Sequence, residues 1–210
     1  MKVLNLYAGI GGNRKLWKDV EVTAVEIDPE IAKIYQEFFP DDKVIVADAH
    51  QYLLEHYKEY DFIWSSPPCP SHSRFNFLTN VQEGKSVKYP DMKLYEEIIL
   101  LQTWFKGKYC VENVISYYDP LIPPVEMASH YFWTNFYIPN TKRTTRNIIR
   151  TTSCEVHIAK KEKQYGFDNL GLKGKRGGQI LNNCVDPKTG LAILNLVLNI
   201  QEPIQEGLFA

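Results

Sequence analysis

Short apolar segments alternate with amphipathic segments along the first half of the chain, and this alternation limits the possible folds more than any other feature. The apolar segments are residues 3–7, 20–26, 44–46, 62–64 and 109–114. Asp28-Pro29 supplies a helix N-cap with proline at the first helical position, and apolar residues at helical spacing follow it. Strands that alternate with helices form a parallel sheet. The sequence therefore predicts an α/β fold with an open, doubly wound, mostly parallel sheet.

The second half of the chain has weaker patterns. Residues 92–105 predict a helix, and the alternating aromatic residues of 130–138 predict a strand. Asp186-Pro187 repeats the N-cap signal and predicts a final helix at about residues 188–201. The polar residues 71–88 predict a long loop, and loops of that length are usually functional.

Length and composition indicate one ordinary globular domain. The chain has 210 residues, of which 44% are hydrophobic and 23% charged, and these values exclude a disordered or collagen-like protein. A transmembrane helix needs about 20 nearly uninterrupted apolar residues, and the best run, 191–200, is about half that. Met1-Lys2 leads directly into the first apolar segment, so we expect no secretory signal, no membrane contact and a cytoplasmic location.

Basic residues are concentrated between Asn140 and Gly178. This stretch contains ten lysines and arginines and three acidic residues, a net charge of +7, whereas the remainder carries −8 of the total of −1. A basic segment on an acidic body indicates a local contact with a polyanion. A solvated, lysine-rich loop is the alternative interpretation.

Small and acidic residues follow the first three predicted strands, at the sheet edge where open α/β folds bind ligands. The turn from Ala8 to Gly12 would allow the close backbone approach that a nucleotide cofactor needs. Glu26 is placed to accept hydrogen bonds from ribose hydroxyls, and Asp48 could bind an adenine amino group. Either carboxylate could equally be an ordinary group at a strand end.

The cysteines suggest a nucleophile rather than a metal site. Cys69, Cys110, Cys154 and Cys184 are far apart, without metal-ligand spacing, so we expect no metal and reduced thiols. Cys69 follows the fourth predicted strand and has prolines on both sides, which favours a rigidly held nucleophile over a core residue.

A carboxylate in the fifth predicted strand also needs an explanation. Glu112 lies between valines in Val111-Glu112-Asn113-Val114, where burial is costly unless a ligand or a structural partner bonds to it. Both kinds of partner remain open on this pattern alone.

In order, these features resemble the cytosine-5 DNA methyltransferases, which transfer a methyl group from S-adenosylmethionine. The resemblance spans nearly the whole chain. It is carried by Leu6-Tyr7-Ala8-Gly9-Ile10-Gly11-Gly12, Glu26-Ile27-Asp28, Asp48, Pro67-Pro68-Cys69, Val111-Glu112-Asn113-Val114 and, weakly, Asn183-Cys184-Val185. It implies the class I S-adenosylmethionine-dependent methyltransferase fold, S-adenosylhomocysteine as product, and no metal.

The resemblance also implies roles for individual residues. Cys69 would attack carbon 6 of cytosine, Glu112 would bond or protonate ring nitrogen 3, and Asn113 would belong to the same catalytic group. The implied cofactor-binding residues are Tyr7, Ala8, Gly9, Gly11, Gly12, Glu26, Ile27, Asp48, Ala49, Pro67, Asn183 and Val185. The candidate substrate-binding residues are Pro68, Ser71, Arg74, His130, Lys142, Arg143 and Arg146.

The chain departs from the family pattern in three places. Pro70 follows the cysteine where the family usually has glutamine. The arginine pair that normally precedes strand six is missing, and His130 and Arg74 are the alternative candidates to replace it. The family usually has a sizeable target-recognition domain late in the chain, and here only the basic stretch occupies its place. We therefore expect a catalytic domain at 1–139, a small basic insertion with a reduced recognition region at 140–178, and a returning C-terminal segment at 179–210.

These departures lead to specific expectations about the substrate. The basic stretch can hold phosphates, and such contacts position a strand without reading its sequence, so we expect loose specificity or a very short site. Double-stranded DNA is the preferred substrate. RNA is one alternative, and a non-catalytic subunit that needs a partner for target recognition is another. Restriction-modification, protection from restriction and regulation all remain open as roles, and the small size favours a phage or bacterial mobile-element protein.

Overall fold

The computed structural model describes residues 1–86, 88–140, 153–167 and 170–200. Within these residues one seven-stranded sheet forms, in the order β3-β2-β1-β4-β5-β7-β6. Its strands are β1 (Lys2–Leu6), β2 (Glu21–Glu26), β3 (Lys43–Val46), β4 (Phe62–Ser65), β5 (Lys108–Val114), β6 (Val125–Met127) and β7 (His130–Thr134). All neighbours are parallel except that β7 runs against β5 and β6. The predicted open, mostly parallel α/β sheet is confirmed.

Seven α-helices occur in the described residues. They are α1 (Pro29–Phe38), α2 (Ala49–His56), α3 (Arg74–Gln82), α4 (Lys93–Trp104), α5 (Cys154–Tyr165), α6 (Gly174–Asn182) and α7 (Pro187–Val197), with a short 3₁₀ turn at Tyr57–Glu59. The side chains of Asp28, Asp48 and Asp186 accept backbone N–H groups at the N-termini of α1, α2 and α7. The predicted caps of α1 and α7 are confirmed. In each, the aspartate side chain satisfies backbone N–H groups that have no partner within the first turn of the helix.

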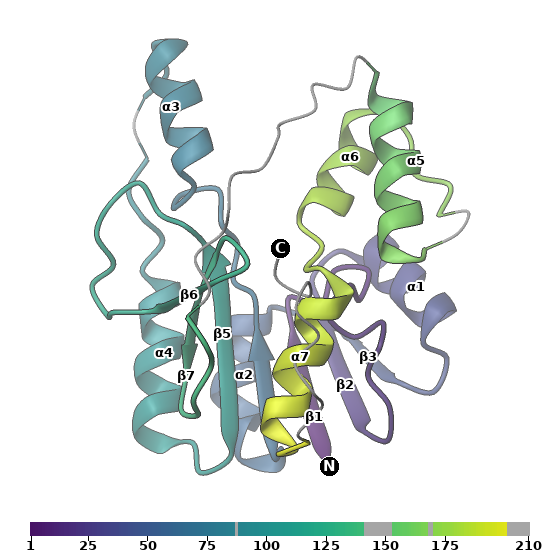
Figure 1. The fold of residues 1–210 in the computed structure, drawn as a ribbon, viewed down its shortest axis with the longest axis vertical. Helices are drawn as coiled ribbons and strands as arrows, with labels where there is room; N and C mark the ends of the chain where they lie inside the picture. Colours follow the sequence, from purple (N-terminus) through teal and green to yellow (C-terminus); the bar gives the residue numbers. More distant parts are fainter. Residues whose placement is uncertain (87, 141–152, 168–169, 201–210) are drawn as a thin grey trace.

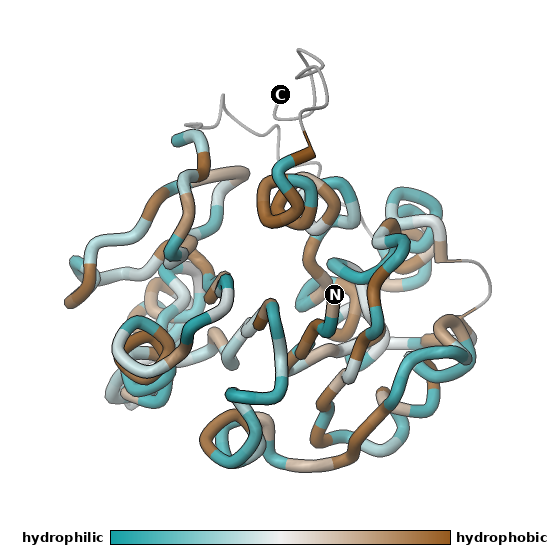
Figure 2. Tube along the Cα trace, turned by 90° about the horizontal axis from the view of Figure 1, so that it is seen from below, coloured by the Kyte–Doolittle hydropathy of each residue, from teal (hydrophilic) through white to brown (hydrophobic). Residues whose placement is uncertain are grey.

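Helices cover both faces of the sheet. On one face α2 and α4 bury a core that includes Leu4, Ile63 and Ile98. On the other face α7 packs with Trp17 and the strands, and Figure 2 shows the largely hydrophobic colouring of this helix. A third cluster joins α1 to α5 and α6.

The contact between α7 and the turn after β1 is unusually close. The Trp17 indole N–H donates to the Gly190 carbonyl oxygen at 3.0 Å. A Cβ atom at Gly190 would lie 2.1 Å from the carbonyl oxygen of Asn13, so glycine is required there. This contact brings the segment before α7, which includes Asn183 and Val185, to the carboxyl edge of the sheet.

Three predicted elements differ from the structure. The predicted loop at 71–88 is wrong, because α3 forms within it, capped by Ser73 and held by a parallel stack of Phe77 on Tyr117 at 4.4 Å between ring centroids. The strand predicted at 130–138 ends at Thr134 and pairs with β6, which the sequence did not predict. The final helix ends at Val197, earlier than predicted.

The expected basic segment, 140–178, contains α5 and the start of α6. These helices pack against each other, and Ile158, Tyr165 and Phe167 join the third core cluster. Figure 1 shows α3 on one side and the α5–α6 pair on the other, both beyond the upper ends of the parallel strands. The residues between these two groups form the candidate site.

Candidate active site

A cleft of about 400 Å³ opens at the carboxyl ends of the parallel strands. Its walls come from the turns after β1, β2, β4 and β5, from the β6–β7 hairpin, and from α6 with the segment that follows it. Of the predicted site residues, it brings together Tyr7, Ala8, Gly9, Gly12, Glu26, Ile27, Pro67, Pro68, Cys69, Glu112, Asn113, His130, Asn183 and Val185. Parallel strands that end at one edge account for this convergence of distant segments.

A second cavity of about 140 Å³ adjoins the cleft and contains the remaining predicted cofactor residues except Gly11. Asp48 and Ala49 line it together with the start of α4. It shares four wall residues with the cleft, namely Tyr7, Ile27, Pro67 and Pro68. The two cavities therefore form adjacent parts of one site.

The glycines of the turn after β1 have different structural reasons. Gly9 has φ +55°, and an added Cβ would meet no atom within 4 Å, so this glycine faces open space in the cleft. Gly11 lies outside both cavities, and a Cβ there would lie 2.3 Å from the Phe39 ring. At Gly12 a Cβ would lie 2.1 Å from the Cys184 sulfur atom. Gly11 and Gly12 thus permit close packing, while Gly9 keeps the cleft open.

The acidic residues after β2 and β3 are both hydrogen-bonded to backbone. Glu26 accepts from the N–H groups of Gly9 at 2.9 Å and Asp28 at 3.0 Å. Asp48 caps α2 through Oδ1, and its Oδ2 lies 3.8 Å from the Lys93 amino group. The backbone hydrogen bond from Gln51 lowers the pKa of Asp48, so this carboxylate is ionised.

The Cys69 loop is held from beneath by Asn113. The Asn113 side-chain amide donates to the Pro67 carbonyl oxygen at 3.0 Å, and the backbone N–H groups of His72 and Ser73 donate to the Cys69 carbonyl oxygen. Burial and the nearby Glu112 charge raise the pKa of the Cys69 thiol. The resting group is therefore a thiol, and Asn113 acts on the loop that carries it.

Glu112 and His130 approach each other from neighbouring antiparallel strands. Glu112 is buried, and its Oε1 lies 3.7 Å from His130 Nε2. His130 Nδ1 lies 3.1 Å from the Ala128 carbonyl oxygen, so Nδ1 carries a proton and donates it. Ala128 and Ser129 both have positive φ, 50° and 66°, which makes a tight two-residue hairpin without the usual glycine or asparagine. This strained hairpin places His130 in the cleft.

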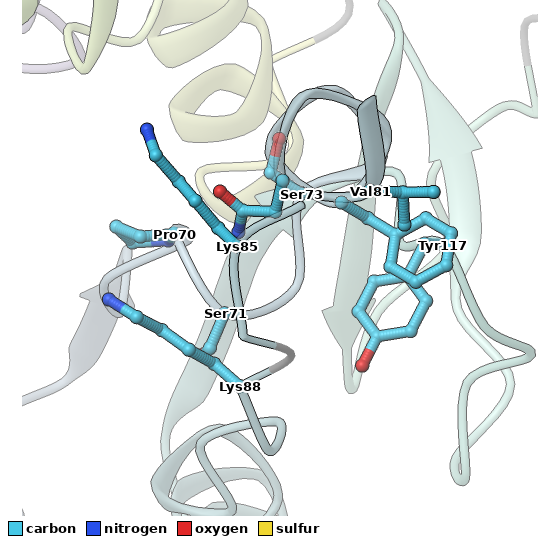
Figure 3. A pocket seen from close by; sticks show the side chains of 9 residues that line it. Pro70, Ser71, Ser73, Val81, Lys85, Lys88 and Tyr117 are labelled. Carbon is cyan, nitrogen blue, oxygen red and sulfur yellow. The ribbon is translucent and has the colours of Figure 1, made fainter. Parts of the chain in front are cut away.

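Several predicted substrate residues lie elsewhere. Ser71 accepts a hydrogen bond from the Asp91 N–H at 3.1 Å and lines a small cavity of about 20 Å³ beside α3. Figure 3 shows that the side chains of Lys85 and Lys88 extend from this cavity towards the side on which Pro70 lies. Arg74 donates to the Ser116 carbonyl oxygen at 3.5 Å. Neither Ser71 nor Arg74 lines the cleft. Lys142, Arg143 and Arg146 lie outside the described residues.

Sequence reasoning missed the contribution of α6 to the cleft. Arg176 bridges from α6 to Asp28 at 2.9 Å and to Glu30 at 2.8 Å at the start of α1. The residues of this region and of the turn after β1 that line the cleft without having been predicted are Ile10, Asn13, Arg176, Gln179, Ile180 and Asn182. The sequence signal that could have predicted α6 is the separation of polar and apolar residues onto two faces of a helix over residues 174–182.

Among the residues that the structure describes, no group of three or more histidine, cysteine and acidic side chains is arranged to hold a metal ion. None of the helices in those residues has the length and apolar composition to cross a membrane.

The solved structures that align with part of this chain include methyltransferases. The DNMT2 protein of Spodoptera frugiperda aligns at 26% identity over 54% of this chain and 35% of that protein, with a TM-score of 0.37. The methyltransferase EhMeth of Entamoeba histolytica aligns at 16% identity over 54% of this chain and 38% of that protein, with a TM-score of 0.36. The chain thus matches little more than a third of either protein's length.

Sequence comparisons give the family. No curated protein matches the chain significantly. A family model described as C-5 cytosine-specific DNA methylase matches residues 1–109, which is more than half of the chain. The protein therefore belongs to the C-5 cytosine-specific DNA methylase family.

Proposed function

We propose that this protein is a DNA (cytosine-5)-methyltransferase that transfers a methyl group from S-adenosylmethionine to carbon 5 of cytosine. The observation that carries the proposal is that Cys69 and Glu112 line the same cleft as the open turn at Gly9 and the Glu26 carboxylate. A thiol, a buried carboxylate and a cofactor cradle within one cleft are the groups that this reaction needs. Membership of the family supports the same reaction.

The shapes of the two cavities fit the cofactor. The open space at Gly9 suits its methionine end, and Glu26 suits its ribose hydroxyls. In the second cavity, the ionised Asp48 presents Oδ2, which lies 3.8 Å from the Lys93 amino group, as an acceptor for the adenine amino group, and Ile27 lines the same cavity. When bound, the cofactor supplies an electrophilic methyl group on its sulfonium. Asn183 and Val185 close the opposite wall of the cleft.

In the proposed reaction Cys69 is the nucleophile and Glu112 the group that accepts charge. The Cys69 thiolate forms a bond to carbon 6 of cytosine, and the displaced electron pair makes carbon 5 nucleophilic. Glu112 takes up a proton as the base binds and donates it in a hydrogen bond to ring nitrogen 3, which draws off the developing charge. After methyl transfer, water takes the proton from carbon 5, the electron pair of that C–H bond forms the double bond between carbons 5 and 6, and Cys69 leaves as a thiolate.

Glu112 also links base binding to activation of the thiol. In the free protein burial, and after it the charge of Glu112, raises the pKa of the Cys69 thiol. When Glu112 is protonated and bonded to ring nitrogen 3, its charge no longer adds to this rise. His130, whose Nε2 lies 3.7 Å from Glu112, is the residue that we propose as the substitute for the missing arginine pair. The thiolate thus forms when the base is in place.

The target base must leave its stack to reach Cys69, because the cleft lies between projecting helices. Lys85 and Lys88 beside α3, and Lys175 on α6, are positive groups on the two sides, suited to phosphates. Phosphate contacts carry no sequence information, so we propose loose sequence specificity or a very short target. A partner subunit would supply recognition if the chain alone selects no site.

Nucleoside mass spectrometry tests the reaction directly. DNA and RNA are each incubated with the protein and S-adenosylmethionine, with Cys69→Ser as the matched inactive variant. The proposal expects 5-methylcytosine in DNA with the wild type and none with the variant. Methylation of RNA alone would change the substrate to RNA. Cofactor binding without methylation of either polymer would refute an autonomous enzyme.

Bisulfite sequencing of the methylated DNA tests the specificity. The reduced recognition region leads us to expect methylation at many sequence contexts or at a site of very few base pairs. A strict target of about six base pairs would contradict this, because each read base needs its own contacts in the groove.

A further inference from the structure

The strongest unexplained feature is a buried carboxylate beneath the second cavity. Glu97 on α4 is 1% exposed and lines neither cavity. It accepts hydrogen bonds from the Tyr7 hydroxyl at 2.6 Å and the Ser65 hydroxyl at 2.6 Å, and His50 Nδ1 lies 3.0 Å from it. Burying a charge is costly unless it is bonded and paired, and here all three partners serve that purpose.

The three partners of Glu97 belong to three separate segments that line the 140 Å³ cavity. Tyr7 is itself a wall residue at the end of β1. His50 follows Asp48 and Ala49 at the start of α2, and Ser65 at the end of β4 precedes Pro67 and Pro68. Leu94 of α4, the helix that carries Glu97, is a further wall residue. The Glu97 carboxylate is therefore bonded to all three of these segments, from the side away from the cavity.

The bond to Tyr7 bears on backbone strain. Tyr7 has φ 54°, a left-handed conformation that costs a non-glycine residue energy and persists only when its surroundings enforce it. Burial and Glu97 raise the pKa of Tyr7, so its hydroxyl keeps the proton that it donates. Tyr7 comes directly before the turn at Ala8 and Gly9, so its orientation sets the direction of that turn.

We propose that Glu97 is a positioning residue of the cofactor site. Its carboxylate holds Tyr7, His50 and Ser65, and through them it fixes the turn after β1, the start of α2 and the Cys69 loop relative to one another. This inference rests on the proposed function in one respect, namely that the two cavities bind the cofactor. Glu97 touches neither cofactor nor substrate, and its effect passes through its three partners.

The charge on His50 gives the arrangement a pH dependence. The groups that face His50 are Glu97 at 3.0 Å and Glu96 at 3.1 Å, with Lys93 and Asp48 nearby. The hydrogen bond to Glu97 raises the pKa of His50 above its ordinary value. Because the folded-state pKa is raised, the ion pair is intact below the ordinary pKa and is lost as pH rises through the raised one. Glu97 then remains buried without its counter-charge.

The test is calorimetric binding of S-adenosylhomocysteine to the full chain. Tyr7→Phe, Ser65→Ala and Glu97→Gln each remove one member of the network. A hydrogen bond to a charged group supports an expected loss in affinity of about tenfold or more for Tyr7→Phe and for Glu97→Gln. The double variant with Tyr7→Phe and Glu97→Gln should bind S-adenosylhomocysteine no more than about twofold more weakly than Glu97→Gln alone, because both changes break the same hydrogen bond.

Tyr52→Phe is the matched control. It removes a tyrosine hydroxyl that bonds Tyr60 at 3.2 Å and lines neither cavity, so its affinity for S-adenosylhomocysteine should equal that of the wild type. The pH profile supplies a readout that a merely structural role would not move. Between about pH 6 and 8.5 the wild-type affinity should fall as pH rises through the pKa of His50, and His50→Gln should flatten the profile.

The outcomes separate the two proposals. If the wild type binds S-adenosylhomocysteine but Tyr7→Phe and Ser65→Ala bind it equally well, the positioning role is refuted and the proposed function stands. If the wild type does not bind it at all, the proposed function fails, and the inference fails with it. If Glu97→Gln does not fold, the two milder variants and the His50→Gln profile still decide the question.

Discussion

Gly9→Ala tests whether the open space beside the turn after β1 is ligand space. Gly9 has φ +55°, so alanine costs about 1–2 kcal/mol of backbone strain. For a chain of this length each kcal/mol corresponds to about 2–4 °C in melting temperature, so the variant should melt about 2–8 °C lower. The added methyl meets no protein atom within 4 Å and projects into the cleft. It should therefore compete with a bound cofactor.

The assay is thermal unfolding with and without S-adenosylhomocysteine at 100 times the wild-type dissociation constant. This excess stabilises the wild type by about 2.7 kcal/mol, or about 5–10 °C. A tenfold loss of affinity in Gly9→Ala reduces the stabilisation to about 1.4 kcal/mol and roughly halves the shift in melting temperature. The expected result is thus a lower melting temperature together with a smaller ligand-induced shift.

Gly84→Ala is the matched control, because Gly84 has φ +63° and equally open surroundings but lies after α3, away from the cleft. It should lose similar stability through strain while keeping the full ligand-induced shift. If Gly9→Ala also keeps the full shift, the space beside Gly9 does not hold the ligand, and the placement of the cofactor is refuted.

Three further predictions concern other parts of the site. Because the pKa of Cys69 is raised, the thiolate fraction still increases between about pH 6.5 and 8.5, so log kcat/KM for methyl transfer should rise over this range without a plateau. A flat profile would argue against a rate-determining thiolate. Asn113→Ala leaves the Pro67 carbonyl without its donor and should lower the free energy of unfolding by about 1–3 kcal/mol, measured by urea denaturation. An unchanged midpoint would mean that the loop is held by other contacts. Gly190→Ala forces α7 away from Asn13 and should cost about 1–3 kcal/mol in the same assay, and a stabilised variant would contradict the close packing.

Local patterns predicted the elements whose stability comes from nearby residues. The caps at Asp28 and Asp186 bond to backbone groups two or three positions away, so their role is visible in the sequence. Of the five parallel strands, β1, β2, β4 and β5 are short apolar runs that are almost wholly buried, as strands inside a parallel sheet must be, while the edge strand β3 is exposed at Lys43 and Val46. Because such strands end at one edge, the convergence of Tyr7, Glu26 and Cys69 followed from the chain order alone.

The helix α3 and the β6–β7 hairpin were decided by contacts between distant segments. The sequence of α3 has only a weak amphipathic pattern, and the helix is held by Phe77 stacked on Tyr117, forty residues away. The hairpin turn at Ala128 and Ser129 adopts positive φ without the residues that normally signal it. Tertiary packing overrides local preference at both places.

The chain's own order of residues thus determined the sheet, the caps and the edge at which the site lies, because these depend on hydrophobic period and local hydrogen bonds. Only the tertiary structure decided what each polar group does there. Gly11 and Gly12 serve packing against Phe39 and Cys184, which no local pattern reveals. Glu97 looks like any helical surface carboxylate in sequence, and only the folded chain brings its three partners to it and makes its burial affordable.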